Sequence, residues 1–489
     1  MKLIKKAIKV AENKIKNNQY EQAELICEQL IKIDPKNVLG LYLLGVSKQK
    51  LKKNNESIEC FDKIVSLLPR NADAYNSLGL ATLSNGDIDK AIELFISAIN
   101  IDPKNANSWS NLGCQFRTKK QFESSIRCLK EAVNLSKSKN DKILVNFAGV
   151  LAEDLQIDKA IKYLKRAIEI NPKNHSAHFD LGCSYFLRNK FKKAWKHFNH
   201  RFKSFENLRL LKSNFSKNKE WKGNKIKDGK TILFFSEQGL GDTINFIRFI
   251  EFFIEKFPNV NIKILVPKEI KNLLENNNKG NFISNIEDHD YWCPLLNIPY
   301  CLGMSQTQIK NNFKPYIKSS KKCDYSKFDK IFKIGICWAG NPAHPRDRER
   351  CCELKYFKEI CDLPNVKLFS LQKDLRPRMW PNEKNPMDLA DCSEIKMINM
   401  SPHMNSWEDT ASIIDGLDLI ISVDTSILHL SGAMGKNTFG LIPKFPDWRW
   451  SLIGNKTIWY PSVRLFRQQN YNDWKSTFIE IKNEIKSFV

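Results

Sequence analysis

A repeat of about 34 residues constrains the fold of the N-terminal half more than any other feature of the sequence. Small residues recur at Gly45, Gly79, Gly113, Ala148 and Gly182, spaced 34, 34, 35 and 34 residues apart. A second set of small residues follows the same period, and each member has an apolar residue four positions later. These pairs are Ala23 and Cys27, Ser57 and Phe61, Ala91 and Phe95, Ser125 and Leu129, Ala160 and Leu164, and Ala194 and Phe198. Small residues allow two antiparallel helices to approach closely, so the period predicts a stack of helical hairpins.

Proline marks the turn after most of these units, at Pro35, Pro69, Pro103 and Pro172. Proline ends a helix because it lacks a backbone N–H group. Lys137 stands where a further proline is expected, next to the one-residue insertion. The pattern resembles the tetratricopeptide repeat (TPR), with six units over residues 1–208. This resemblance implies a superhelix that recruits a protein partner on its concave face, and the phenylalanines at helical spacing are assigned to packing.

Charge is distributed evenly along the chain. The 489 residues carry a formal net charge of +24. Residues 1–208 hold 36 basic and 22 acidic side chains, and residues 209–489 hold 42 and 32. Nucleic-acid-binding proteins concentrate basic residues in one patch, so this distribution disfavours a nucleic-acid partner. A peripheral contact with anionic lipid, or an acidic substrate, is favoured over it.

Cysteine usage and hydropathy indicate the compartment. The 13 cysteines are scattered and form no C-x-x-C pair, which disfavours a disulfide framework or a structural zinc site. No apolar run approaches the roughly 20 residues that a membrane span needs. The segment MKLIKKAIKVAENK lacks the apolar core of a signal peptide. We therefore expect a cytoplasmic protein without a transmembrane segment.

The second half alternates between short apolar segments and amphipathic ones. Residues 209–230 hold eight basic and two acidic residues and little apolar material, so we expect a linker there. Strand, turn and helix then alternate in a way that is typical of parallel sheets. The predicted strands are 231–236, 261–266, 331–338, 366–372, 397–401, 417–424 and 438–442, and residues 471–489 have helical spacing. We expect two Rossmann-like α/β domains, residues 231–328 and 329–489, that face each other across a cleft.

A glycine-rich turn, EQGLGD, follows the first predicted strand. Gln238, Gly239 and Gly241 lie at the carboxyl end of that strand, where α/β sheets bind ligands. Asp242 then stands at the start of the next helix, either as a base for a substrate hydroxyl or as a helix cap. The turn lacks both the G-x-G-x-x-G dinucleotide pattern and the lysine of a phosphate-binding loop. The sequence therefore supports neither NAD nor ATP binding.

The segment SVDTSILHLSGAMGK follows the strongest predicted strand. Asp424 ends the strand, and Thr425 and Ser426 open a helix whose N-terminus suits a pyrophosphate. His429 lies one turn into this helix and faces either the cleft or the core. It is therefore a candidate for catalysis or a structural histidine.

Two further segments supply candidate phosphate ligands. The loop after Trp338 contains Asn341, Arg348 and Arg350, and arginines there either clamp phosphates or form a solvated charged run. Gln372 and Lys373 follow another strand and are candidates for the same ligand. The aromatic segments FPDWRW and TIWYP either stack on a base or sugar ring or pack in the core.

Several blocks, taken in order, resemble those of a known family. These blocks are EQGLGDTINFIRF, ICWAGNPAHPRDRER, LFSLQK, WEDTASIIDGLDLIISVDTSILHLSGAMGK, PDWRW and WYPSVRLFRQ. They are similar to bacterial TPR-containing glycosyltransferases, whose catalytic half is related to the ADP-heptose:lipopolysaccharide heptosyltransferases. The resemblance implies a GT-B fold with the acceptor on the first Rossmann-like domain and the nucleotide-sugar donor on the second. One departure is Cys351, where relatives usually carry serine after the arginine.

The resemblance also implies roles for individual residues. Asp242 corresponds to the proposed base, and Asp424, Thr425 and His429 lie beside the donor diphosphate. Catalysis is expected to be inverting, without a metal ion or other cofactor. The acceptor is a protein or a glycan, and the alternative is a non-catalytic TPR scaffold whose GT-B half has lost turnover.

Overall fold

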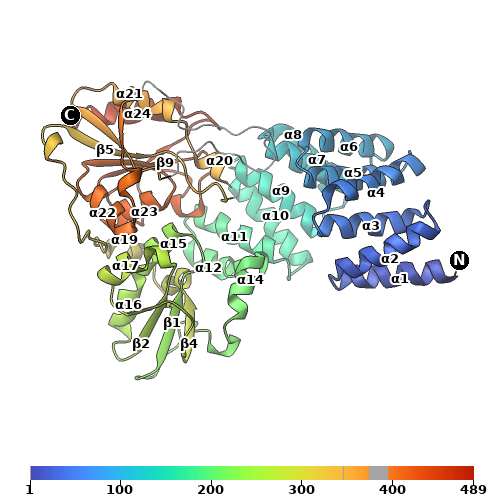
Figure 1. Cartoon of the computed structure of the whole chain (residues 1–489), viewed down its shortest axis with the longest axis horizontal. Coiled ribbons are helices and arrows are strands. Elements are labelled where there is room, and N and C mark those ends of the chain that lie inside the picture. The colour runs from blue at the N-terminus through green and yellow to red at the C-terminus, as the bar shows by residue number, and fades with distance from the viewer. Residues whose placement is uncertain (1, 345, 374–394) are drawn as a thin grey trace. The chain divides into compact units, whose positions relative to one another are not determined.

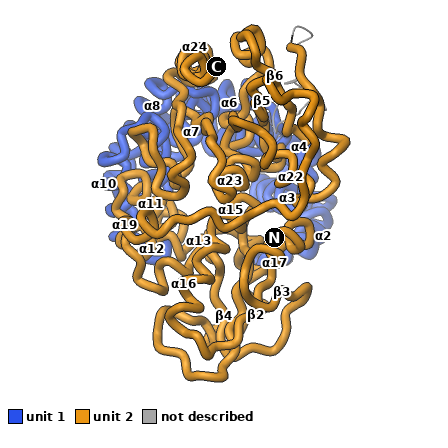
Figure 2. The backbone as a smooth tube through the Cα atoms, turned by 90° about the vertical axis from the view of Figure 1, so that its left-hand side faces the viewer, with its two compact units in different colours: residues 1–174, 381–384 blue, residues 175–380, 385–489 orange. Residues whose placement is uncertain are grey.

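The computed structural model describes residues 2–344, 346–373 and 395–489. The chain divides into two compact units, the first ending at Asn174 and the second beginning at His175 (Figure 2).

The first unit consists of helices that alternate in direction along the chain (Figure 1). Their bounds are α1 Lys2–Lys16, α2 Tyr20–Ile33, α3 Val38–Lys50, α4 Asn54–Leu67, α5 Ala72–Ser84, α6 Ile88–Ile101, α7 Ala106–Thr118, α8 Phe122–Leu135, α9 Asp141–Glu153 and α10 Ile157–Ile170. Consecutive helices pack against each other as hairpins. The prediction of N-terminal TPR-type helical repeats is confirmed.

The glycines of the repeat leave the space that the facing helix fills. A Cβ atom on Gly45 would lie 2.8 Å from the Phe61 ring, and one on Gly79 would lie 2.7 Å from the Phe95 ring. Phe61 and Phe95 are 2% and 0% exposed. The two recurring positions of the sequence therefore belong to one packing contact, which recurs between Gly113 and Leu129.

Asparagine starts the first helix of successive repeats. The side-chain oxygens of Asn37, Asn71 and Asn105 accept hydrogen bonds from backbone N–H groups three residues later, at 2.9, 3.0 and 3.1 Å. Each satisfies a donor that the helix start leaves open. The one-residue insertion is accommodated by Lys137 and Ser138, whose φ angles are both positive, at 50° and 54°.

The second unit begins with one more helical hairpin and two short helices. Their bounds are α11 His175–Leu187, α12 Phe191–Phe198, α13 Arg201–Ser204 and α14 Glu206–Ser213. In the segment expected to be a linker, residues 209–230, the side chains of Phe215, Trp221 and Ile226 are buried. Phe215 stacks on Phe235 with ring centroids 4.4 Å apart. This segment thus packs on the first sheet.

The first α/β lobe has a four-stranded parallel sheet in the order β3-β2-β1-β4. Its elements are β1 Thr231–Phe235, α15 Leu240–Ile247, α16 Phe249–Lys256, β2 Asn261–Leu265, α17 Lys268–Asn277, β3 Asn281–Ile283, β4 Tyr291–Pro294, α18 Ile298–Cys301 and α19 Gln306–Asn311. All side chains of β1 after Thr231 are buried, as expected for a central parallel strand.

The second lobe has a six-stranded parallel sheet in the order β10-β9-β8-β5-β6-β7. Its elements are β5 Phe332–Cys337, α20 Asp347–Arg350, α21 Lys358–Cys361, β6 Val366–Ser370, β7 Met397–Asn399, α22 Trp407–Asp415, β8 Leu419–Val423, α23 Ser426–Ala433, β9 Thr438–Ile442, β10 Val463–Arg467 and α24 Lys475–Ile485. The predicted α/β class with parallel strands is confirmed for the C-terminal half.

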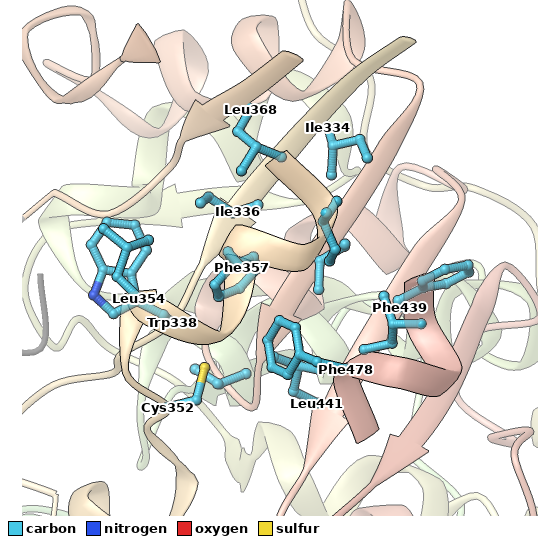
Figure 3. Packing of buried hydrophobic residues seen from close by; sticks show 14 of the residues in the cluster. Ile334, Ile336, Trp338, Cys352, Leu354, Phe357, Leu368, Phe439, Leu441 and Phe478 are labelled. Atoms are coloured by element: carbon cyan, nitrogen blue, oxygen red, sulfur yellow. The ribbon is translucent and has the colours of Figure 1, made fainter. Parts of the chain in front are cut away.

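One face of the second sheet is covered by the closing helix. Ile334 and Ile336 of β5 and Leu441 of β9 belong to one buried cluster with Phe357 and Phe478 (Figure 3). The Phe357 and Phe478 rings meet edge to face at 4.7 Å. This core fixes the sheet whose loops carry most of the candidate site.

Candidate functional site

The sequence-predicted site residues lie at the carboxyl ends of parallel strands in both lobes. The loop after β1 carries Gln238 and Gly239, and the loop after β5 carries Asn341. Asp424 and Thr425 follow β8 directly. Arg449, which was not among the predicted site residues, lies between β9 and β10. Ligands of open α/β sheets bind at such strand ends.

Asp242 is the third residue of α15, and Gly239 is the residue that precedes this helix. One carboxylate oxygen, Oδ2, accepts a hydrogen bond from the backbone N–H of Gly239 at 3.2 Å. Asp242 therefore stabilises the helix start from within the first turn and is not itself the N-cap residue. Its other oxygen, Oδ1, forms an ion pair with Arg449 of the second lobe.

Gly241 brings α15 against α23, and the two helices pack on each other across the lobes. A Cβ atom on Gly241 would lie 2.6 Å from Cδ2 of His429. Any side chain at this position would collide with the imidazole ring. The glycine turn and the histidine of the second lobe, which the sequence could not place together, are thus in contact.

His429 is buried and contacts polar groups on both sides of its ring. Nδ1 is hydrogen-bonded to the Tyr460 hydroxyl at 3.0 Å, and Nε2 lies 3.8 Å from Oδ1 of Asp424. The ring stacks on Trp450 with centroids 5.5 Å apart. Burial lowers the pKa of His429 to about 4, although the Asp424 carboxylate opposes the shift. The imidazole is therefore neutral at pH 7.

Arg350 ties the loop after β5 to the loop after β8. Its Nη1 donates to the backbone oxygen of Asp424 at 2.9 Å, and its Nε donates to Oδ1 of Asp347 at 3.0 Å. Its Nη2 donates to the backbone oxygen of Asn341 at 3.4 Å. Arg348, on the same short helix, is exposed. The structure thus places Arg350 beside the start of α23.

The remaining predicted donor ligands differ in their surroundings. Gln372 is buried, and its Oε1 accepts a hydrogen bond from the backbone N–H of Ala339 at 3.0 Å, so its amide oxygen holds the loop after β5. Thr425 is the N-cap residue of α23, and its hydroxyl lies 3.0 Å from that of Ser422. Ser426 is the first residue of α23. Lys373 is exposed.

Arg449 is the charged residue that the sequence analysis missed. Its side chain is 8% exposed, and Nη1 contacts Oδ1 of Asp447 at 2.6 Å. Its Nη2 donates to Oε1 of Gln238 at 3.4 Å, in addition to the ion pair with Asp242. Burial lowers the pKa of Arg449 to about 9, which leaves it protonated at pH 7. Arg449 lies inside the segment FPDWRW, and only the aromatic rings of that segment were considered as candidate ligand contacts from the sequence.

Except for half-buried Phe445, the aromatic residues of FPDWRW and TIWYP pack in the interior. Trp448, Trp450, Trp459 and Tyr460 are 7%, 1%, 0% and 0% exposed. The Trp448 ring lies 4.4 Å from that of Phe186 in α11. Of the two interpretations, burial favours packing over stacking on a base or sugar ring.

The described part of the chain shows neither a metal-binding cluster nor a membrane-spanning helix. Within residues 2–344, 346–373 and 395–489, no three histidine, cysteine, aspartate or glutamate side chains are placed to hold one metal ion. None of the helices described is both long and apolar enough to cross a membrane.

Comparison with known proteins identifies the N-terminal repeats. Tetratricopeptide repeat models match residues 42–106 and residues 143–174. The chain is 21% identical over 306 residues to Protein FlbA of Caulobacter vibrioides, an alignment that covers 55% of this chain and 48% of FlbA. The chain thus spans about half the length of the curated relative that it matches.

Solved TPR structures resemble part of the chain. The thermophilic TPR protein TTC0263 of Thermus thermophilus is 18% identical, covers 37% of this chain and 98% of its own, and has a TM-score of 0.35. The pilF protein of Pseudomonas aeruginosa is 15% identical, covers 43% and 97%, and has a TM-score of 0.36. The repeat matches and the helical hairpins agree: the chain carries tetratricopeptide repeats at its N-terminus, which imply a role in binding protein partners.

Proposed function

We propose that this chain is a glycosyltransferase that moves a sugar from a nucleotide-sugar donor to an acceptor hydroxyl, with its two α/β lobes arranged as a GT-B pair. One observation carries the proposal: residues of the two lobes contact each other at the carboxyl ends of the two sheets. Asp242 of the first lobe pairs with Arg449 of the second, and Gly241 contacts His429. A reaction between two substrates uses such a junction, because each lobe can hold one of them.

Asp242 is the proposed base. The acceptor oxygen attacks the anomeric carbon, its proton passes to the Asp242 carboxylate, and the bond to the diphosphate breaks with its electron pair on the leaving oxygen. Such a base must lie within hydrogen-bond reach of the attacking hydroxyl. The Arg449 guanidinium pairs with Asp242 in this structure, so we propose that the anionic donor draws Arg449 toward its phosphates and releases the carboxylate.

The donor diphosphate is assigned to the second lobe. Arg348 and Arg350 supply positive charge, and Thr425 and Ser426 supply backbone N–H groups at the start of α23. Asn341 and Lys373 flank this region, and Gln372 holds the loop in place. Neutral His429 keeps its contacts with Asp424 and Tyr460 and orients the strand end.

The alternative function is a non-catalytic TPR scaffold, in which the α/β lobes only support protein binding. The buried carboxylate–arginine pair at the lobe junction favours the enzyme, because a purely structural junction gains little from burying charge. As part of the same proposal, the acceptor is a protein or a glycan. The TPR array recruits a protein acceptor or another protein partner.

Donor binding distinguishes the enzyme from the scaffold. We expect one class of nucleotide sugar, or its nucleoside diphosphate, to raise the melting temperature, since a ligand that binds the folded state stabilises it by about 2.7 kcal/mol at 100 times its Kd. The matched control is Arg350→Met in the same panel, which should lose most of the shift. A panel of UDP-, GDP-, ADP-, CDP- and dTDP-sugars that leaves the melting temperature of the parent unchanged would contradict the proposal.

A further inference from the structure

We propose that Arg201, which belongs to α13 beside the last helical hairpin, is a positioning residue for the glycine turn that carries Asp242. This inference rests on the proposed function of that turn. Arg201 acts through Glu237, the first residue of the EQGLGD segment.

The guanidinium of Arg201 joins three segments. Its Nη2 donates to Oε1 of Glu237 at 2.6 Å and to Oδ1 of Asn297 at 2.9 Å. Its Nη1 donates to Oδ1 of Asn199 at 3.0 Å. Glu237 follows β1 and Asn297 follows β4, which is the neighbour of β1 in the sheet. One side chain therefore fixes the ends of two adjacent strands to the end of the last helical hairpin.

The Arg201–Glu237 pair is completely buried, with both side chains 0% exposed. The Phe198 and Phe202 rings flank the guanidinium, with centroids 4.8 and 4.3 Å from Cζ. Burying two charges costs desolvation free energy that their attraction often fails to recover, and apolar pairs of similar volume are commonly as stable. Stability alone therefore does not explain why two charges are buried at this position. A requirement for a fixed geometry of the glycine turn does explain it.

Other contacts of the glycine turn come from its own helix and from the second lobe. The Thr243 hydroxyl donates to the backbone oxygen of Gly239 at 3.2 Å, and Gln238 and Asp242 contact Arg449. Gly239 and Gly241 have no side chain, and Gln238 and Leu240 are half-buried, whereas Glu237 is fully buried and ties the turn to the first lobe and α13. A shift of about 1 Å in a reacting group can lower a rate about 100-fold. Holding Glu237 thus holds the backbone that places Asp242.

Hydrogen exchange tests, without any substrate, whether the Arg201–Glu237 pair orders the glycine turn. The variant is the full chain carrying Arg201→Met together with Glu237→Leu, which removes both charges of the pair and leaves Oδ1 of buried Asn297 without its Arg201 donor. We expect a modest fall in melting temperature from that lost hydrogen bond, while the backbone amides of residues 238–243 exchange at least about tenfold faster. The matched control is Lys212→Met, which removes the ion pair of Lys212 with Glu220 at 2.9 Å but does not touch the turn.

Kinetics supply the second readout. The double variant should bind nucleoside diphosphate with unchanged Kd and lose about 100-fold in kcat. Unchanged exchange in residues 238–243, or equal acceleration in Lys212→Met, would overturn the positioning role. If the parent transfers no sugar, the proposed function fails, yet the exchange comparison still decides whether Arg201 orders the turn.

Discussion

At the scale of single residues, the pairing of Asp242 with Arg449 most affects how the proposed site works. Neither the spacing of the glycine turn nor the segment FPDWRW predicts it, because the two residues belong to different lobes and meet only after folding. Local pattern alone makes Asp242 either a base or a helix cap and His429 either catalytic or structural, and the family resemblance implies their site roles. Local pattern does not reveal that Asp242 pairs with Arg449 or that His429 contacts Gly241.

His429 has a testable effect on stability. Its pKa is about 4 in the folded protein against an ordinary value of 6.5. Between those values the unfolded chain binds a proton that the folded chain does not, so the free energy of unfolding falls as the pH falls through this window, by up to about 3 kcal/mol. His429→Gln should lose this dependence. The measurement is urea unfolding of both proteins from pH 7.5 to pH 4.

Other histidines with lowered pKa, among them His175, His200 and His344, are present in both proteins, so the difference between the two curves isolates His429. Parallel stability curves for the parent and His429→Gln across that range would contradict the burial of a neutral imidazole.

At the scale of elements, the repeated helical hairpin was predictable because its signal is local and recurs. The short strands β3, β4 and β10 were not predicted: β3 has three residues, β4 ends in proline, and two of the five residues of β10 are arginines. Such segments become strands because neighbouring strands pair with them. The sheet order likewise depends on contacts that sequence spacing does not reveal.

The repeat contact predicts a coupling between two positions. Gly79→Ala should destabilise the protein by about 1–2 kcal/mol, because the new Cβ would lie 2.7 Å from the Phe95 ring. In a Phe95→Leu background the same change should be neutral or stabilising by up to about 1 kcal/mol, since alanine is the better helix former. Alanine and leucine stand at the corresponding positions of another repeat, Ala148 and Leu164.

The measurement is a double-mutant cycle by chemical denaturation. Additive effects of Gly79→Ala and Phe95→Leu would contradict the direct packing of these positions.

At the scale of the whole molecule, protein binding is assigned to the repeats and sugar transfer is proposed for the α/β lobes. The positive charge that a leaving diphosphate needs would come from Arg350, Arg449 and the start of α23. We therefore expect transfer to persist in excess EDTA. Activity that is lost with EDTA and restored by manganese or magnesium would contradict transfer without a metal ion. The control is the activity after buffer exchange alone.

The transfer rate of Asp242→Asn tests the central claim most directly. Asparagine can still accept the hydrogen bond from Gly239 but cannot take the acceptor proton, so we expect a folded protein that binds the donor and transfers sugar about 10²–10⁴-fold more slowly. The matched control is Asp447→Asn, which also removes a carboxylate from Arg449 but no proposed base, and should retain far more activity. Transfer by Asp242→Asn at a rate close to that of the parent would contradict the account.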